Sequence, residues 1–205
     1  MISILKLAVL SSTRATDMDA LVDAIRYDSL KAQIVVVIAN KKCPALERAV
    51  GFGIPAVFLD GAGKSREEYD RELHKVLRQH QVDLVLLIGY MRYLSKWFVN
   101  QWPHKIMNIH PSLLPEFAGG MDLNVHEEVL KAGKKESGAT LHFVDETADG
   151  GPIIFQKKVK IDDDETAETL KHKVQSVEQE LIVKAVRLYA DKKINVRDNT
   201  VLVEE

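Results

Sequence analysis

The sequence predicts an α/β protein built on a doubly wound, mainly parallel twisted sheet with helices on both faces. Short apolar runs alternate with segments of helical periodicity along the chain. Several of these runs are continuous in valine, isoleucine and leucine, which is typical of strands covered on both sides. No repeat, low-complexity segment or linker interrupts the pattern. We therefore expect residues 1–205 to form a single domain.

In the first half of the chain, the pattern predicts four strands and three helices. The apolar runs that we assign to strands are 4–10, 34–39, 55–59 and 82–88. The helices are expected over 17–30, 45–50 and 65–80. Ser65 and Glu68 have the spacing of a capping box at the start of the third helix.

The second half changes character, because longer strands follow one another without a helix between them. We expect a short strand at 105–110, a helix at 125–132 and two longer, partly exposed strands at 140–145 and 153–161. Asp164 or Thr166 caps a final helix that runs to about Tyr189. In an open sheet of this kind, ligands bind beyond the carboxyl ends of the strands.

Composition narrows the class of protein. A formal net charge of −2 gives no electrostatic reason to expect a nucleic acid or an acidic membrane surface as partner. The single cysteine, Cys43, excludes an internal disulfide and fits a reducing compartment. We find no signal peptide and no apolar run long enough to cross a bilayer, and so expect a soluble cytoplasmic protein.

Three polar side chains at predicted strand ends form the candidate catalytic group. Asn108 and His110 lie two residues apart on the strand 105–110, so they point to the same face of the sheet. Asp149 precedes Gly150 and Gly151, which we expect to let the backbone approach a ligand closely. The same residues would also fit purely structural roles, at the end of a strand and in two turns.

The chemistry available to this trio is acyl transfer. A carboxylate beside an imidazole favours its cationic form, so we expect the pKa of His110 to rise toward or above neutrality. The imidazolium and the Asn108 amide would then donate to the oxygen of a carbonyl under attack. Ser112 is the rival nucleophile, but it has no elbow motif. The attacking group is therefore expected to be an amine of a second substrate.

The sequence contains no convincing motif for a metal site or a dinucleotide-binding site. The seven histidines lack ligand spacing, so no metal site is expected. The glycines around 51–53 formally match a dinucleotide fingerprint, but they follow a helix where the motif needs a strand.

Three longer motifs carry a resemblance to a known family. They are 108–115 (NIHPSLLP), 138–144 (GATLHFV) and 149–154 (DGGPII). The chain resembles the folate-dependent formyltransferases from about Leu7 to Tyr189. That resemblance implies a Rossmann-like fold and transfer of a formyl group from 10-formyltetrahydrofolate, as co-substrate, to the amine of glycinamide ribonucleotide in purine biosynthesis.

The resemblance also implies roles for individual residues. His110 would be the general acid, Asn108 would polarise the formyl carbonyl, and Asp149 would raise the pKa of the histidine and relay a proton. The folate would be bound by Arg66, Met91, Arg92, Tyr93, Leu94, Asn108, Val144 and Asp145. The ribonucleotide would be bound by Thr13, Arg14, Ala15, Thr16, Asp17 and Glu178.

Two loops depart from the family pattern. The phosphate loop, usually rich in glycine, is here the glycine-free segment 11–17, in which the Asp17 carboxylate opposes an anion. The loop around Gly119 and Gly120 also differs. The alternatives are therefore a formyltransferase or formyltetrahydrofolate hydrolase of the same fold with another acceptor, and a non-catalytic folate- or nucleotide-binding protein. Small molecules are the expected partners, bound by a monomer or homodimer.

Overall fold

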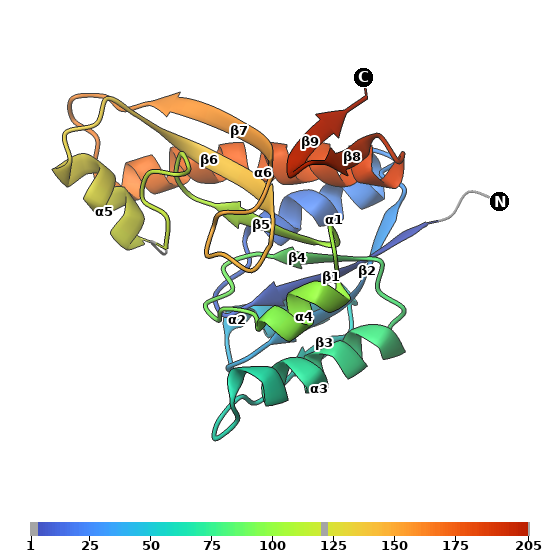
Figure 1. Cartoon of the computed structure of the whole chain (residues 1–205). Coiled ribbons are helices and arrows are strands. Elements are labelled where there is room, and N and C mark those ends of the chain that lie inside the picture. Colours follow the sequence, from blue (N-terminus) through green and yellow to red (C-terminus); the bar gives the residue numbers. More distant parts are fainter. Residues whose placement is uncertain (1–3, 120–122, 205) are drawn as a thin grey trace.

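A seven-stranded twisted sheet organises the molecule in a computed structural model that describes residues 4–119 and 123–204 (Figure 1). Its strands follow the order β3-β2-β1-β4-β5-β6-β7. They are β1 (Leu5–Ser11), β2 (Ala32–Ala39), β3 (Ala56–Phe58), β4 (Leu84–Leu87), β5 (Ile106–His110), β6 (Glu136–Phe143) and β7 (Ile153–Lys160). β8 (Ile194–Arg197) and β9 (Thr200–Val203) form a separate antiparallel hairpin.

Helices cover both faces of the sheet, as predicted. They are α1 (Asp17–Tyr27), α2 (Pro44–Gly51), α3 (Arg66–Gln79), α4 (Lys96–Gln101), α5 (Leu123–Lys131) and α6 (Ala167–Ala190). α1 and α6 lie above the sheet in Figure 1, with α3 and α4 below it. Each face has its own hydrophobic core, one packed on α1, α2, α5 and α6 and the other on α3 and α4.

The parallel part of the sheet runs from β3 to β5, and its central strands are apolar because both faces are covered. Leu7 to Leu10 of β1 and Leu84 to Leu86 of β4 are fully buried. The neighbours of β1 are β2 and β4, so the strand order reverses between β1 and β4. A crevice at such a reversal is where ligands bind in open α/β sheets.

The antiparallel part of the sheet departs from the predicted strands. β6 pairs antiparallel with β5, and β7 antiparallel with β6. The prediction of a partly exposed strand at 140–145 is wrong for β6, which begins at Glu136 and is buried from Ser137 to Phe143. Two elements bury it: α6 packs against one face of β6, and the loop 112–119 contacts Thr140 on the other.

Two further elements, α4 and the β8–β9 hairpin, were not predicted. α4 has six residues, too short to show a helical period, although Ser95 caps it by accepting a hydrogen bond from the Phe98 N–H at 3.2 Å. The predicted capping box at α3 is confirmed, with Ser65 and Glu68 exchanging hydrogen bonds of 3.3 and 2.8 Å. Of the two candidates for the cap of α6, the structure has Thr166.

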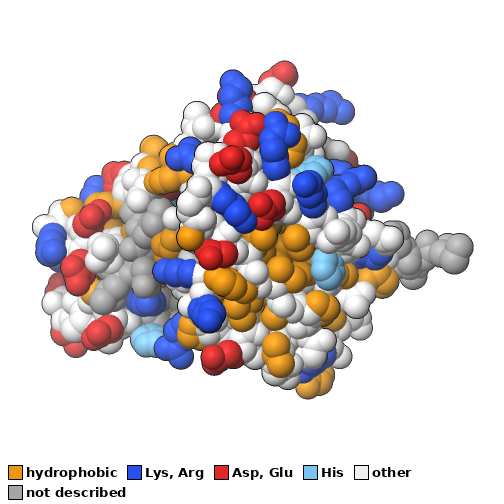
Figure 2. Space-filling view, turned by 90° about the horizontal axis from the view of Figure 1, so that it is seen from below, with side chains coloured by type: hydrophobic (Ala, Val, Ile, Leu, Met, Phe, Trp, Pro, Cys, Tyr) orange, Lys and Arg blue, Asp and Glu red, His pale blue; other side chains and the backbone are white. Residues whose placement is uncertain are grey.

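Charges are mixed over the surface. Figure 2 views the molecule from below and shows side chains of both signs interspersed with hydrophobic ones. Within the described residues, no helix combines the length and the apolar character that a membrane span requires.

Candidate active site

One large cavity of about 750 Å³ opens at the carboxyl ends of β1, β4 and β5, where the strand order reverses. Every residue that the sequence nominated for the site lines it. These are Thr13, Arg14, Ala15, Thr16, Asp17, Arg66, Met91, Arg92, Tyr93, Leu94, Asn108, His110, Val144, Asp145, Asp149 and Glu178. The cavity has the size and the mixed apolar and polar lining of a small-molecule site.

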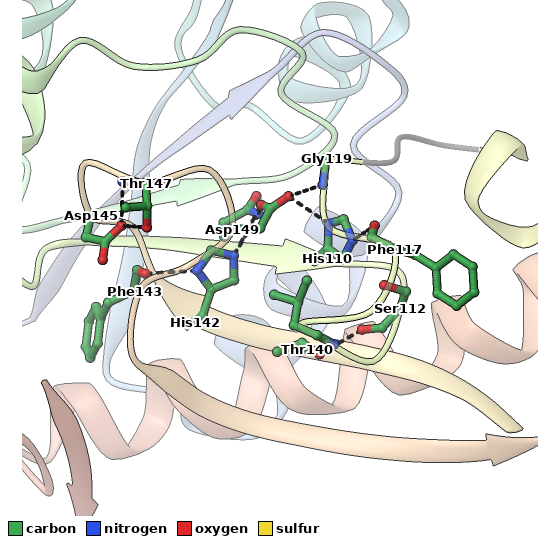
Figure 3. A network of polar contacts seen from close by, with 12 residues as sticks. His110, Ser112, Phe117, Gly119, Thr140, His142, Phe143, Asp145, Thr147 and Asp149 are labelled. Carbon is green, nitrogen blue, oxygen red and sulfur yellow. Dashed lines mark hydrogen bonds and ion pairs between the residues drawn. The ribbon is translucent and has the colours of Figure 1, made fainter. Parts of the chain in front are cut away.

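The candidate catalytic residues Asn108, His110 and Asp149 all line this cavity. Figure 3 shows His110 and Asp149 facing each other. Nδ1 of His110 lies 3.6 Å from one carboxylate oxygen of Asp149. The side-chain amide of Asn108 donates to the other oxygen at 3.3 Å. The same-face prediction for Asn108 and His110 is therefore confirmed, since both reach one carboxylate from β5.

A second histidine completes the cluster. His142 on β6 is the cross-strand partner of Asn108, and its Nε2 lies 3.1 Å from the Asn108 amide nitrogen and 3.6 Å from Asp149. Its Nδ1 faces the carbonyl of Phe143 at 2.9 Å, which requires a hydrogen on Nδ1. We did not nominate His142, because only the antiparallel pairing of β5 and β6 puts it beside Asn108.

The expected rise in the pKa of His110 is wrong for this structure. Burial of the ring lowers its pKa, and this effect exceeds the opposing effects of Asp149 and of the Phe117 carbonyl, which accepts from Nε2 at 3.1 Å. Asp149 behaves as an anion: although burial acts to raise its pKa, the neighbouring His142 side chain and the Gly119 N–H, which donates at 2.8 Å, hold it at about 2.

The glycines after Asp149 serve a different purpose from the one expected. A Cβ on Gly151 would lie 1.9 Å from the Phe143 carbonyl oxygen, and one on Gly150 would lie 2.2 Å from Oγ1 of Thr147. Gly151 therefore lets the loop pack against the backbone at the end of β6, whereas Gly150 makes room for the side chain of Thr147. The left-handed conformation falls on Asp149 itself, at φ 52°.

The glycine-free loop 11–17 includes a residue in the left-handed backbone region that glycine adopts most easily. Ala15 is buried and has φ 47°, a region that an alanine enters with a penalty of roughly 1 kcal/mol. Thr13 packs against Gly89 after β4, where a Cβ would meet its hydroxyl at 2.2 Å. Arg14 is exposed and lines the cavity.

Asp17 is not fully ionised near neutral pH, in contrast to what the sequence suggested. It is the first residue of α1 and is 6% exposed. Burial raises its pKa to about 7, although hydrogen bonding to Gln175 and Gln179 of α6 opposes this effect. Near neutral pH the group is therefore partly protonated, which weakens the repulsion of an anion.

The residues predicted to bind folate also line the cavity. The Arg66 guanidinium lies 5.8 Å from the ring centre of Tyr93, and that of Arg92 lies 4.3 Å from the ring centre of Tyr69. Met91 is held by its N–H, which donates to the Ser12 hydroxyl at 2.8 Å. The two cations thus sit on aromatic surfaces beside an apolar wall.

The structure also bears on Ser112, on the loop around Gly119 and on the possibility of a metal site. Ser112, the rival nucleophile, is fully buried, and its hydroxyl donates to the Glu116 carbonyl at 3.1 Å instead of lining the cavity. Gly120 lies outside the described residues, whereas Gly119 donates to Asp149. Among the residues that the structure describes, no cluster of three histidine, cysteine or acidic side chains is placed to hold a metal ion.

An open α/β sheet, a cavity at its switch point and a cluster of amide, imidazole and carboxylate on the cavity wall are the features of an enzyme active site. A family model described as formyl transferase matches residues 5–186. The chain belongs to this family.

Relatives and solved structures agree with that assignment. The chain is 36% identical over 196 residues to phosphoribosylglycinamide formyltransferase of Haemophilus influenzae, covering 95% of this chain and 91% of that protein. It is 40% identical to the trifunctional purine biosynthetic protein adenosine-3 of Bos taurus, of which it spans 19%. The crystal structure of glycinamide ribonucleotide transformylase 1 from Symbiobacterium toebii superimposes with a TM-score of 0.94 at 33% identity, covering 100% of this chain and 96% of that one.

Proposed function

We propose that the protein transfers a formyl group from 10-formyltetrahydrofolate to the amine of glycinamide ribonucleotide, a step of purine biosynthesis. The observation that carries the proposal is the meeting of Asn108, His110 and Asp149 on the wall of one cavity large enough for two ligands. The identity of the acceptor is inferred from the relatives of nearly the same length, which are named phosphoribosylglycinamide formyltransferase.

The folate end of the cavity supports a flat, partly apolar ligand with an anionic tail. Leu87, Met91, Leu94 and Val144 provide apolar wall beside the strand ends. Arg66 and Arg92 provide fixed charges that suit the carboxylates of a folate tail. We therefore assign this side of the cavity to 10-formyltetrahydrofolate.

The acceptor end is formed by the loop 13–17 and by α6. Backbone N–H groups at the start of α1 and the Arg14 guanidinium would bind the phosphate. Glu178 of α6 would hold the glycinamide end, at the far side of the same cavity. The partly protonated Asp17 makes this loop compatible with an anion.

The transfer itself needs no protein nucleophile. The amine nitrogen of the acceptor attacks the formyl carbon, and the electron pair of the carbonyl moves to its oxygen. One N–H of Asn108, whose 3.3 Å contact with Asp149 is long, turns to that oxygen. The bond from carbon to the folate nitrogen then breaks, while the proton lost by the amine replaces it on that nitrogen.

His110 and Asp149 provide the route for the proton. His110 carries a hydrogen on Nε2, because a carbonyl oxygen faces that atom. A proton taken up on Nδ1 points toward Asp149, whose pKa of about 2 keeps it anionic. The carboxylate thus stabilises the imidazolium, which is the form in which His110 acts as the acid.

An assay of formyl transfer with a panel of acceptors tests the proposal. We expect turnover of 10-formyltetrahydrofolate with glycinamide ribonucleotide, and turnover without acceptor that is slower by about three orders of magnitude. Equal rates with and without the acceptor would instead identify a hydrolase. Binding of folate without turnover of any acceptor would favour the non-catalytic alternative.

We further propose a cytoplasmic location and action on small molecules as a monomer or homodimer. The single cysteine supports a reducing compartment.

A further inference from the structure

The loop between β5 and α5 holds both members of the histidine–carboxylate pair. Its Phe117 carbonyl accepts the hydrogen on Nε2 of His110 at 3.1 Å, and its Gly119 N–H donates to Asp149 at 2.8 Å. Phe117 has φ 57°, a conformation that a bulky residue keeps only when its surroundings enforce it. The position of this loop therefore decides how the two side chains are held (Figure 3).

A fully bonded threonine anchors the start of that loop to the sheet. The Thr140 hydroxyl donates to the Ser112 carbonyl at 2.7 Å and accepts from the Leu114 N–H at 3.1 Å. It also accepts from the Gln156 amide at 2.8 Å. A hydroxyl has one hydrogen and two lone pairs, so all three of its bonding positions are used, inside a site that is completely buried.

Gln156 extends the anchor to the neighbouring strand. The same amide nitrogen donates to the Leu114 carbonyl at 2.9 Å. The Ser112 hydroxyl then closes the loop on itself through the Glu116 carbonyl, one residue before Phe117. A continuous set of hydrogen bonds thus runs from β7 through β6 to the Glu116 carbonyl, one peptide unit before the carbonyl that faces His110.

We propose that Thr140 and Gln156 are positioning residues for formyl transfer, which fix the loop 112–119 so that it selects the Nε2–H form of His110 and orients Asp149. The expected changes in kcat rest on the proposed function. The expected changes in the tautomer and pKa of His110 do not. Thr140 and His110 are cross-strand partners, so the anchor lies directly beside the residue that it serves.

Loss of the anchor has a defined electrostatic consequence. The Phe117 carbonyl favours the protonated form of His110, because it accepts from Nε2. If the Phe117 carbonyl moves away, the protonated form loses this acceptor, and the pKa of His110 falls. Since the imidazolium is the acid, the basic limb of the kcat profile should move to lower pH.

Thr140→Val and Thr140→Ser separate the hydrogen bonds from the shape of the side chain. Valine keeps the volume of the threonine side chain but removes the hydroxyl, whereas serine keeps the hydroxyl and loses the methyl group. We expect Thr140→Val to lower kcat by about tenfold to a hundredfold and to shift its basic limb, with KM for both substrates within about twofold. Thr140→Ser should retain the kcat and pH profile of the wild type.

Gln156→Met is a second variant that removes part of the anchor without disturbing the core, because Gln156 lies at an exposed position of β7. Its matched control is Lys158→Met, two residues along the same face of that strand. We expect Gln156→Met to shift the pH profile in the same direction as Thr140→Val, and Lys158→Met to leave it unchanged. If Thr140→Val does not fold, this pair decides the question.

Nitrogen-15 NMR of the histidine ring tests the proposal without substrate. In the wild type we expect His110 as the Nε2–H tautomer. In Thr140→Val and Gln156→Met, its pKa should fall and the other tautomer should gain population. Unchanged tautomer and pKa in both variants would overturn the proposal, as would equal loss in Thr140→Ser and Thr140→Val. A wild-type protein without transfer activity would contradict the proposed function alone, because the NMR measurement still reports on the anchor.

Discussion

At the scale of single residues, the carboxylate of Asp149 is the centre of the site. One oxygen faces the Asn108 amide and His142, and the other faces His110 and the Gly119 N–H. A carboxylate with this many donors remains ionised, which explains a pKa of about 2 despite its partial burial. In the proposed mechanism, Asp149 stays an anion and His110 is the group that gains and loses the proton.

Asp17→Asn tests the electrostatics of the phosphate loop. Because the folded-state pKa of Asp17 is raised from 3.8 to about 7, its contribution to stability is full below about pH 4 and is lost as the pH rises through 7. The variant should therefore have the higher Tm at about pH 9 and a similar Tm at about pH 4. Thermal unfolding at the two pH values measures this, and a variant that is less stable at both would contradict the assigned pKa.

Arg14→Ala tests the assignment of the acceptor end. The exposed guanidinium lines the cavity beside the N-terminus of α1, so its loss should weaken binding of a phosphate. We expect KM for glycinamide ribonucleotide to rise by roughly tenfold or more, and KM for the folate to change by less than about twofold. Equal increases for both substrates would show that Arg14 does not bind the phosphate.

At the scale of elements, the site depends on how loops pack against strand ends. The loop that carries Asp149 lies on the end of β6 so closely that Gly151 has no room for a side chain. The loop 112–119 is tied to β6 and β7 by side-chain hydrogen bonds. The two loops meet where Gly119 donates to Asp149, so a shift of either one moves the carboxylate.

Gly151→Ala tests this packing. The new Cβ would meet the Phe143 carbonyl oxygen at 1.9 Å, so the loop must move and carry Asp149 with it. We expect a loss of about 1–3 kcal/mol in the free energy of unfolding and a kcat lower by about tenfold or more. Gly51→Ala is the control, because nothing lies within 4 Å of its Cβ. Chemical denaturation and the transfer assay measure both effects, and an unchanged kcat in Gly151→Ala would refute the close packing.

The elements that the sequence predicted are those whose burial follows a simple period. β1, β2 and β4 were predicted because each contains a continuous apolar run, and α3 because its cap and its buried face are regular. α4 was too short to show a period. The antiparallel pairing of β5 with β6 was not predicted, because the apolar pattern of a strand does not show which strand it pairs with or in which direction.

The same distinction applies to the site. Asn108 and His110 were predicted to act together from their two-residue spacing on one strand. His142 and the Phe117 carbonyl were missed, since one requires the strand pairing and the other a backbone conformation at φ 57°. The direction of the His110 pKa was wrong because sequence shows the neighbouring charge and not the burial that outweighs it.

At the scale of the whole molecule, topology brings distant segments to one place. The strand order reverses between β1 and β4, so the loops after β1, β4 and β5 open onto the same crevice. α6 closes the acceptor side, and the turn after β6 adds the carboxylate. The central claim is that this arrangement makes His110 and Asp149 a proton route for formyl transfer.

The most direct test is the transfer rate of the wild type beside His110→Ala and Asp149→Asn, with saturating 10-formyltetrahydrofolate and glycinamide ribonucleotide. Asparagine keeps the size of Asp149 and its ability to accept from Gly119, and removes only the charge. We predict that kcat falls by about a hundredfold or more in both variants, while folded structure and folate binding persist. Wild-type turnover no faster than that of either variant would contradict the account.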